Sequence, residues 1–247
     1  MRLFGLIGYP LGHSWSEKYF TDKFSAGGMI DAEYKLYPIK DIDEFGTLLQ
    51  RYKFSGLNVT VPYKQSVIPF LDEIDDVAKA VGAVNTIKFY AVNNKIITKG
   101  YNTDIYGFEC LLNKFVLLPG IKALILGTGG SSKAVAYVLN RKNIRFHFVS
   151  RSPSGKNIFS YGDLDEKVIA GHKIIINTTP CGMYPDAGKS PGIPYEFISG
   201  GHICIDLIYN PEKTLFLQRC EEHNASVING LEMLNMQAEQ SWKIWNE

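Results

Sequence analysis

Residues 121–152, "IKALILGTGGSSKAVAYVLNRKNIRFHFVSRS", carry the clearest structural pattern of the chain. Its hydrophobic pattern predicts a buried strand at 122–126, a glycine loop at 127–130, a helix at 131–142 and a second strand at 145–149. About 30 residues arranged as strand, helix and strand are typical of a βαβ unit. This part of the chain is therefore expected to form an α/β domain of the Rossmann type.

The glycine loop predicts a dinucleotide cofactor. Gly127 and Gly129 match the first two glycines of the dinucleotide fingerprint, whereas Ser132 stands at the third position and Gly130 is an additional glycine. Glycines let backbone N–H groups approach a pyrophosphate, and the helix N-terminus favours its negative charge. A tight strand-to-helix turn without a ligand would use the same residues, but the strand–loop–helix–strand setting favours the cofactor.

The end of the second strand favours NADP over NAD. An NAD site places an acidic residue there to bind the ribose 2′-hydroxyl, whereas this corner reads Ser150-Arg151-Ser152, with Lys156 nearby. An arginine fork between two hydroxyl groups suits a 2′-phosphate.

The first half of the chain predicts a second α/β layer. Through the first 80 residues strand-like and helical patterns alternate, which indicates parallel pairing. The expected strands are 2–8, 32–39 and 56–64, and the expected helices are 14–28, 42–54 and 66–83, the last broken at Pro69. A hairpin follows with Asn93-Asn94 at its turn, and then a helix at 105–115. Further buried strands are expected within 172–183 and 201–209, and the last segment, 230–247, predicts an amphipathic helix.

Composition and charge exclude several classes of protein. Against 25 acidic residues the chain has 26 basic ones, so no basic excess points to nucleic acid or to an anionic membrane surface. The four cysteines form no C-x-x-C pair, which predicts reduced thiols and no metal site. No apolar run reaches the ~20 residues of a membrane helix, and the start lacks a signal-peptide pattern. We therefore expect a cytoplasmic protein.

The segment "NVTVPYK", residues 58–64, places polar groups where a strand ends. Pro62 must interrupt the backbone ladder, and Asn58, Thr60 and Lys64 surround it. One interpretation is an edge strand that ends at a proline. The other is the wall of a polar pocket with a catalytic lysine at its rim.

Nine separated motifs bring these features into one known pattern. In chain order they are "GYPLGHSWS", "GLNVTVPYK", "GAVNT", "GYNTD", "GTGGSSKA", "SRS", "NTTPCGM", "DLIYNPEKT" and "NGLEMLNMQA", between residues 8 and 238. With these motifs the chain resembles the shikimate dehydrogenase family, the NADP-dependent enzymes of aromatic amino-acid (chorismate) biosynthesis. The resemblance implies an N-terminal α/β substrate domain, residues 1–104 joined by the C-terminal helix 229–247, and a Rossmann-type NADP domain, residues 105–228. The active site would lie in the cleft between them.

The resemblance also implies roles for individual residues. Ser14 and Ser16 would hold the substrate carboxylate, and Lys64 and Asp104 would form the catalytic pair; His13 is interpreted as a structural or surface residue. Contacts to the ring hydroxyls or the pocket wall would come from Asn58, Thr60, Asn85, Asp104, Tyr209 and Gln237. The cofactor would be bound by Gly127, Thr128, Gly129, Gly130, Ser131, Ser150, Arg151, Ser152, Thr178, Leu207, Gly230, Met233 and Asp76. Met233 is also expected to pack on the last helix.

The implied reaction is the reversible reduction of 3-dehydroshikimate to shikimate with NADPH. The carbonyl oxygen gains negative charge and needs a proton, which the ammonium of Lys64 can supply. Two alternatives remain open: a quinate or quinate/shikimate dehydrogenase with NAD use, and a non-catalytic metabolite-binding relative. The expected partners are small molecules, with a monomer or homodimer as the assembly.

Overall fold

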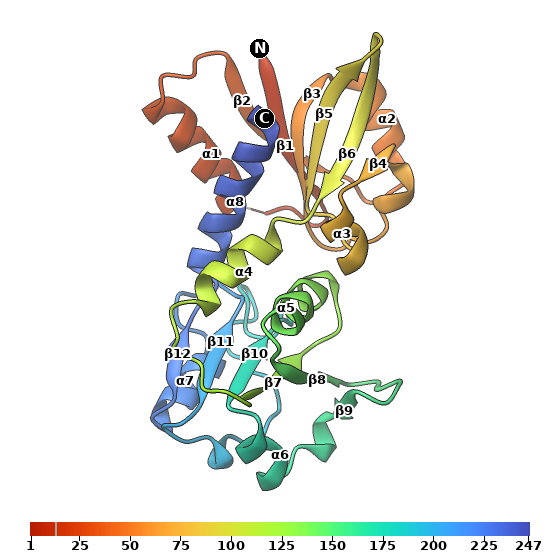
Figure 1. The fold of residues 1–247 in the computed structure, drawn as a ribbon. Coiled ribbons are helices and arrows are strands. Elements are labelled where there is room, and N and C mark those ends of the chain that lie inside the picture. The colour runs from red at the N-terminus through yellow and green to blue at the C-terminus, as the bar shows by residue number, and fades with distance from the viewer. Residues whose placement is uncertain (13) are drawn as a thin grey trace. The chain divides into compact units, whose positions relative to one another are not determined.

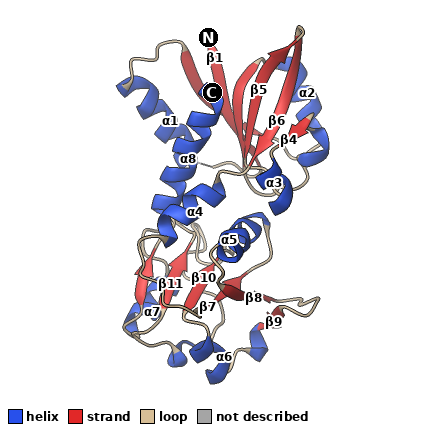
Figure 2. Cartoon of the chain, viewed as in Figure 1, coloured by secondary structure: helices blue, strands red, loops and turns tan. Residues whose placement is uncertain are grey.

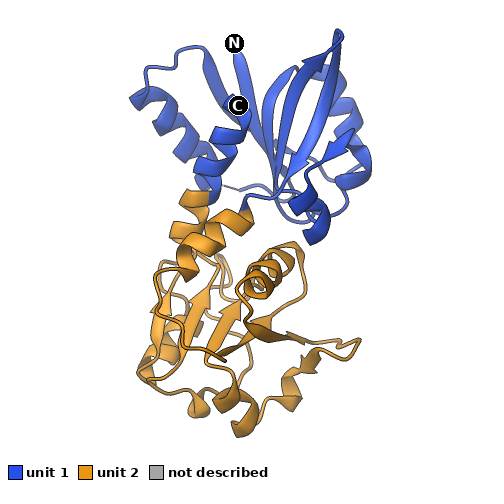
Figure 3. Ribbon diagram, in the orientation of Figure 1, with its two compact units in different colours: residues 1–103, 237–247 blue, residues 104–236 orange. Residues whose placement is uncertain are grey.

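The computed structural model describes residues 1–12 and 14–247, so His13 lies outside the described residues. The described chain divides into two compact units, residues 1–103 with 237–247 and residues 104–236, called unit 1 and unit 2 below (Figure 3). No helix among the described residues is long and apolar enough to cross a membrane.

Unit 1 is built on a six-stranded mixed sheet in the order β2-β1-β3-β5-β6-β4 (Figure 1). Its strands are β1 (Arg2–Gly8), β2 (Ala32–Pro38), β3 (Phe54–Val59), β4 (Glu73–Ile74), β5 (Thr86–Val92) and β6 (Lys95–Tyr101), and its helices are α1 (Trp15–Ala26), α2 (Glu44–Arg51) and α3 (Asp76–Val81). β1 pairs in parallel with β2 and β3, as expected, whereas β5 pairs antiparallel with β3 and β6. Asn93 and Asn94 form the hairpin turn with φ of 49° and 63°, as predicted.

The alternation of side chains along β1 separates two cores. Phe4 packs on one face of the sheet with Phe20 of α1 and Trp245 of α8 (Leu231–Asn246). Ile7 packs on the opposite face with Phe45 of α2. Side chains of a buried strand point alternately to the two faces, so helices are needed on both faces of this sheet.

One of the two interpretations of residues 58–64, the edge strand, and the expected helix at 66–83 are wrong. β3 lies between β1 and β5 and is no edge strand; it ends at Val59, and residues 61–67 form turns. The segment expected as a broken helix at 66–83 instead forms a short 3₁₀ turn (Ile68–Phe70), the strand β4 and the helix α3. Asp72 bonds to the backbone and hydroxyl of Thr98 and thereby holds this segment beside β6. A long-range contact thus overrides the local helical pattern.

Unit 2 contains a six-stranded parallel sheet in the order β12-β11-β10-β7-β8-β9. Its strands are β7 (Lys122–Leu126), β8 (Arg145–Ser150), β9 (Ile158–Ser160), β10 (Ile174–Asn177), β11 (Ile203–Asp206) and β12 (Ser226–Ile228), and its helices are α4 (Asp104–Leu112), α5 (Gly130–Arg141), α6 (Glu166–Gly171), α7 (Leu215–Glu222) and the first part of α8 (Figure 2). From β7 the chain runs outward through β8 and β9 and then returns to continue through β10, β11 and β12. This doubly wound order confirms the Rossmann-type prediction.

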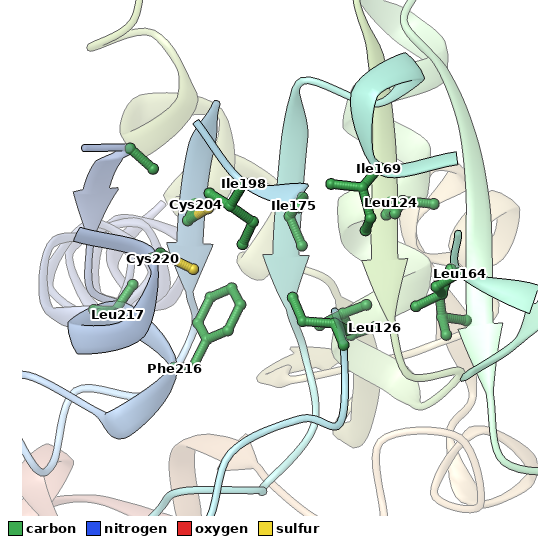
Figure 4. Close-up of a cluster of buried hydrophobic side chains, with 13 residues drawn as sticks. Leu124, Leu126, Leu164, Ile169, Ile175, Ile198, Cys204, Phe216, Leu217 and Cys220 are labelled. Carbon is green, nitrogen blue, oxygen red and sulfur yellow. The ribbon is translucent and has the colours of Figure 1, made fainter. Parts of the chain in front are cut away.

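The core of unit 2 is apolar and continuous across the sheet (Figure 4). Leu124 and Leu126 of β7 and Ile175 of β10 contribute from the strands, and Phe216 from α7 covers them. The sequences of strands that are covered on both faces are continuous apolar runs. The order in which strands are added to the sheet reverses between β7 and β10, although the two strands are parallel. This position is a topological switch point, the place where open α/β sheets bind ligands.

Candidate active site

A buried polar network lies at the carboxyl end of β3 in unit 1. Asn58 donates from Nδ2 to Oγ of Ser241 at 3.0 Å and to Oγ1 of Thr86 at 3.3 Å, and the hydroxyls of Thr86 and Ser241 lie 2.8 Å apart. Thr103 joins through its hydroxyl, 3.2 Å from each of these two oxygens. All four residues are buried. The network therefore has a fixed geometry, because a buried polar group must keep its partners.

Asn85 and Gln237 extend this network. Oδ1 of Asn85 accepts from the backbone N–H of Thr103 at 2.7 Å, and Nδ2 donates to the hydroxyl of Thr103 at 3.0 Å. Oε1 of Gln237 lies 3.5 Å from Nδ2 of Asn85 and 3.4 Å from Oγ1 of Thr103. The structure therefore brings Asn58, Asn85 and Gln237 into one cluster, although they come from three distant parts of the chain.

Sequence reasoning missed Thr86, Thr103 and Ser241. Each stands beside a predicted residue: Thr86 follows Asn85, Thr103 precedes Asp104, and Ser241 lies one helical turn after Gln237. This proximity to predicted site residues is the signal by which the sequence could have pointed to them.

The corner after β3 holds Thr60 and Lys64. The backbone N–H of Thr60 donates to the carbonyl of Ile7 at 2.9 Å, and its own carbonyl accepts from the N–H of Tyr63 at 2.9 Å. The carbonyl of Lys64 accepts from the N–H of Val84 at 2.7 Å, directly before Asn85. The Tyr63 hydroxyl is anchored on the carbonyl of Ile39 at 2.7 Å. Lys64, which is half-buried, is thus held next to the polar network.

The two serines open α1. Ser14 is its N-cap, and Oγ of Ser14 accepts from the backbone N–H of Ser16 at 3.2 Å. Ser16 lies near Tyr34, whose hydroxyl donates to Oδ1 of Asn58 at 2.8 Å. Burial raises the pKa of Tyr34, so its hydroxyl stays protonated as a donor. Tyr34, which sequence reasoning also missed, therefore lies between Ser16 and the polar network.

Lys64 and Asp104 belong to different compact units. Lys64 lies in the turn after β3 in unit 1, whereas Asp104 is the first residue of α4 and of unit 2, where it is buried. Asp76, which was expected near the cofactor, is the first residue of α3 in unit 1.

The glycine loop of unit 2 has the geometry that a pyrophosphate needs. Gly127 has φ of +106°, and a Cβ there would lie 2.9 Å from Oγ1 of Thr178, so only glycine fits. At Gly129, the N-cap of α5, a Cβ would meet nothing within 4 Å, so the backbone faces open space. Thr128 and Gly129 are exposed, and Gly130 and Ser131 are partly exposed. The first N–H groups of a helix bind anions in such a setting.

The remaining cofactor candidates lie at the carboxyl ends of the parallel strands. Ser150 ends β8, and its Oγ accepts from the N–H of Ser152 at 3.2 Å, while Arg151 between them is exposed. On the other side of the switch point, Thr178 follows β10 and donates to the carbonyl of Leu126 at 2.6 Å. These residues fit a dinucleotide that extends from the glycine loop in both directions along this edge of the sheet.

Gly230 lies against the segment that follows β11. A Cβ at Gly230 would lie 2.1 Å from the carbonyl oxygen of Leu207, so this close approach excludes every larger residue. Its N–H donates to the carbonyl of Ile208 at 3.1 Å. Tyr209 is partly exposed in the same segment, and Met233 is buried on α8.

Comparisons with known proteins agree with this geometry. Residues 6–87 match the family model described as the shikimate dehydrogenase substrate binding domain. The shikimate dehydrogenase (NADP(+)) of Clostridium beijerinckii is 39% identical, with 100% of this chain and 93% of the relative covered. That of Methanosphaera stadtmanae is 35% identical, with 98% and 90% covered.

Solved structures agree over the whole chain. Shikimate dehydrogenase 1 from Peptoclostridium difficile gives a TM-score of 0.87 at 38% identity, covering 100% of this chain and 92% of that one. The shikimate 5-dehydrogenase of Thermus thermophilus, solved in complex with NADP(H) and shikimate, gives 0.85 at 28% identity, covering 99% and 93%. The chain belongs to the shikimate dehydrogenase family.

Proposed function

We propose that this chain catalyses the reversible, NADPH-dependent reduction of 3-dehydroshikimate to shikimate, a step of chorismate biosynthesis. The observation that carries the proposal is the convergence of Asn58, Asn85 and Gln237 into one buried polar network next to Lys64. A ring with several hydroxyl groups needs such a set of donors and acceptors in fixed positions, because each unpaired group would cost free energy.

The substrate carboxylate is bound at the start of α1. Ser14 and Ser16 offer hydroxyl donors there, and the first N–H groups of the helix favour a negative charge. Thr60, Asn85 and Gln237 contact the ring hydroxyls, and Tyr209 reaches the substrate from the cofactor side. Asn58 already has partners for its amide oxygen and nitrogen. It therefore serves the pocket by holding Thr86, Ser241 and Tyr34 in place.

Lys64 and Asp104 carry the proton chemistry. In the reduction, the Lys64 ammonium stabilises the developing negative charge on the carbonyl oxygen and donates the proton; in the reverse direction the neutral amine accepts it. The Asp104 carboxylate holds the lysine and the neighbouring substrate hydroxyl in place. NADPH, when bound, supplies the hydride.

NADPH is bound along the carboxyl edge of the unit 2 sheet. The backbone from Gly127 to Ser131 cradles the pyrophosphate, and the Ser150–Ser152 corner with Arg151 takes the 2′-phosphate. Thr178, Leu207, Gly230 and Met233 line the nicotinamide half, and Asp76 is assigned to the cofactor from unit 1. In this assignment residues 1–104 with 229–247 form the substrate domain and residues 105–228 the NADP domain.

Turnover of shikimate tests this proposal. Purified protein incubated with shikimate and NADP is expected to form NADPH, which is followed by the absorbance of the reduced nicotinamide. Absence of turnover with shikimate would reject the proposal, and turnover confined to quinate would assign the chain to the quinate branch of the family.

A further inference from the structure

Asp206 is a buried carboxyl group that the assigned chemistry does not use. It ends β11 beside Asn177, which ends β10, and its side chain accepts three hydrogen bonds. Oδ1 accepts from Nδ2 of Asn177 and from the backbone N–H of Ile208, both at 3.0 Å, and Oδ2 accepts from the hydroxyl of Thr214 at 2.6 Å. Asp206, Asn177 and Thr214 are each 0% exposed. A carboxylate surrounded by donors in this way fixes the position of every donor.

Through Asn177, Asp206 orders the loop after β10. Oδ1 of Asn177 accepts from the N–H of Thr179 at 3.0 Å and from its hydroxyl at 2.7 Å. Oγ1 of Thr179 in turn accepts from the N–H of Cys181 at 3.2 Å. Thr178, between these anchors, donates to the carbonyl of Leu126, directly before the glycine loop. The orientation of Asn177 therefore sets the conformation of residues 178–181.

Through Ile208 and Thr214, Asp206 orders the segment after β11. The bond to the N–H of Ile208 turns the chain directly after the strand, between Leu207 and Tyr209. Thr214 closes the other end of the segment, because its hydroxyl also caps α7 by accepting from the N–H of Leu217 at 3.3 Å. One carboxyl group thus holds two loops at the same edge of the sheet.

We propose that Asp206 is a positioning residue for hydride transfer: its carboxylate, acting through Asn177 and Thr214, holds the loops that present Thr178 and Leu207 to the nicotinamide half of the cofactor and Tyr209 to the substrate. This inference rests on the function proposed above. Groups that orient the residues around a reacting centre contribute to rate because small displacements there slow the reaction strongly.

The protonation state of Asp206 provides a separate signature. Burial raises the pKa of Asp206 to about 6, although its three hydrogen bonds act in the opposite direction. Among the described residues, the titratable groups that interact with its charge are the thiols of Cys181, in the loop after β10, and Cys220, on α7. Burial raises the pKa of Cys181, and the neighbouring Cys204 thiol raises the pKa of Cys220, so both thiols stay neutral. A protonated Asp206 loses an acceptor, and one of its three donors must then find another partner.

The central experiment compares wild type with Asp206→Asn, which keeps the shape but replaces one acceptor oxygen with a donor. We expect kcat to fall about 100-fold, with smaller changes in the KM for shikimate and in the dissociation constant of NADP, because the proposed carboxylate site at the start of α1 and the Ser150–Ser152 corner lie outside the two loops. In wild type, kcat should decline as the pH falls through about 6, and the variant should lack that decline. In the cofactor-free protein, the amides of Thr179 and Ile208 should exchange hydrogen faster in the variant.

A second set of variants separates positioning from stability. Thr214→Val removes the donor to Asp206 and the cap of α7, whereas Thr214→Ser keeps both and should restore activity. Asp165→Ala is the matched control, because Asp165 caps α6 by accepting from the N–H of Val168 at 2.8 Å. Both cap losses should lower the melting temperature by a few degrees, but only Thr214→Val should lower kcat and speed the exchange of Ile208.

Each outcome decides the inference. Wild-type kcat and wild-type exchange rates in Asp206→Asn would overturn it, as would equal losses of activity in Thr214→Val and Asp165→Ala. If Asp206→Asn fails to fold, the Thr214 series gives the answer. Failure of the proposed function is a different result, namely no turnover by wild type, and the exchange measurements on the cofactor-free protein still test the ordering of the loops.

Discussion

The hydroxyl of Tyr34 on β2 donates a hydrogen bond to Oδ1 of Asn58 on β3 at 2.8 Å, although β1 lies between these strands in the sheet. Asn58 in turn donates to Oγ of Ser241 on α8 at 3.0 Å, and Ser16 at the start of α1 lies near Tyr34. The elements β2, β3 and α8 are therefore joined by one chain of buried hydrogen bonds. Tyr34 thus lies between the proposed carboxylate site and the proposed hydroxyl site.

Replacement of Tyr34 with Phe should damage both stability and substrate binding. The variant leaves Oδ1 of Asn58 without its donor, so we expect the free energy of unfolding to fall by about 1–3 kcal/mol and the KM for shikimate to rise. Tyr37→Phe is the matched control, because the buried Tyr37 hydroxyl has no hydrogen-bond partner among the described residues. Denaturant unfolding and steady-state kinetics of both variants check this, and equal effects of the two would contradict the assigned link.

Replacement of Lys64 with Met should remove the proton donor but retain the length of the side chain. We expect kcat to fall by about 10²–10⁴-fold, with nearly unchanged binding of NADPH in a fluorescence titration. Lys53→Met, at an exposed lysine before β3, serves as the control and should keep its activity. A Lys64→Met variant with wild-type turnover would remove Lys64 from its assigned role.

Replacement of Arg151 with Ala should weaken NADP far more than NAD. The guanidinium is assigned to the 2′-phosphate, which NAD lacks, so we expect the KM for NADP to rise about 10- to 100-fold while that for NAD stays close to wild type. Arg145→Ala, at an exposed arginine that begins β8, tests for a general charge effect. Equal losses for both cofactors would count against the phosphate assignment.

The raised pKa of Asp206 predicts how stability depends on pH. Its folded pKa of about 6 exceeds the ordinary value of 3.8, so the folded state binds the proton more tightly than the unfolded state. Ionised Asp206 therefore costs about 3 kcal/mol above pH 6, and this cost is relieved as the pH falls from about 6 to about 4. In urea unfolding, the stability of wild type relative to Asp206→Asn should rise over this window. A constant difference would show that the pKa is not raised.

Sequence predicted those elements that depend on local pattern. The strand at 122–126 was predicted with its observed bounds, because a strand buried on both faces is a continuous apolar run. The Asn93-Asn94 turn was also correct, because asparagine tolerates positive φ. The prediction of a helix at 66–83 was wrong because the pairing of β4 with β6 depends on contacts with Lys99 and Gly100, which no local pattern reveals.

The polar support of the site could not be predicted for the same reason. Tyr34, Ser241 and Asp206 are ordinary residues in the sequence, and only the fold makes them buried hydrogen-bonding centres. Their partners lie 24, 183 and 29 residues away in the chain. The motifs predict which residues touch ligands, whereas the residues that support this predicted set could be found only in the structure.

The substrate and cofactor are tested together by comparing kcat/KM for shikimate and quinate, each with NADP and with NAD, on the purified protein. We predict the highest value for shikimate with NADP, because the polar network of unit 1 and the Ser150–Ser152 corner of unit 2 are assigned to these two ligands. No turnover in any of the four combinations, or a preference for quinate with NAD, would contradict the account.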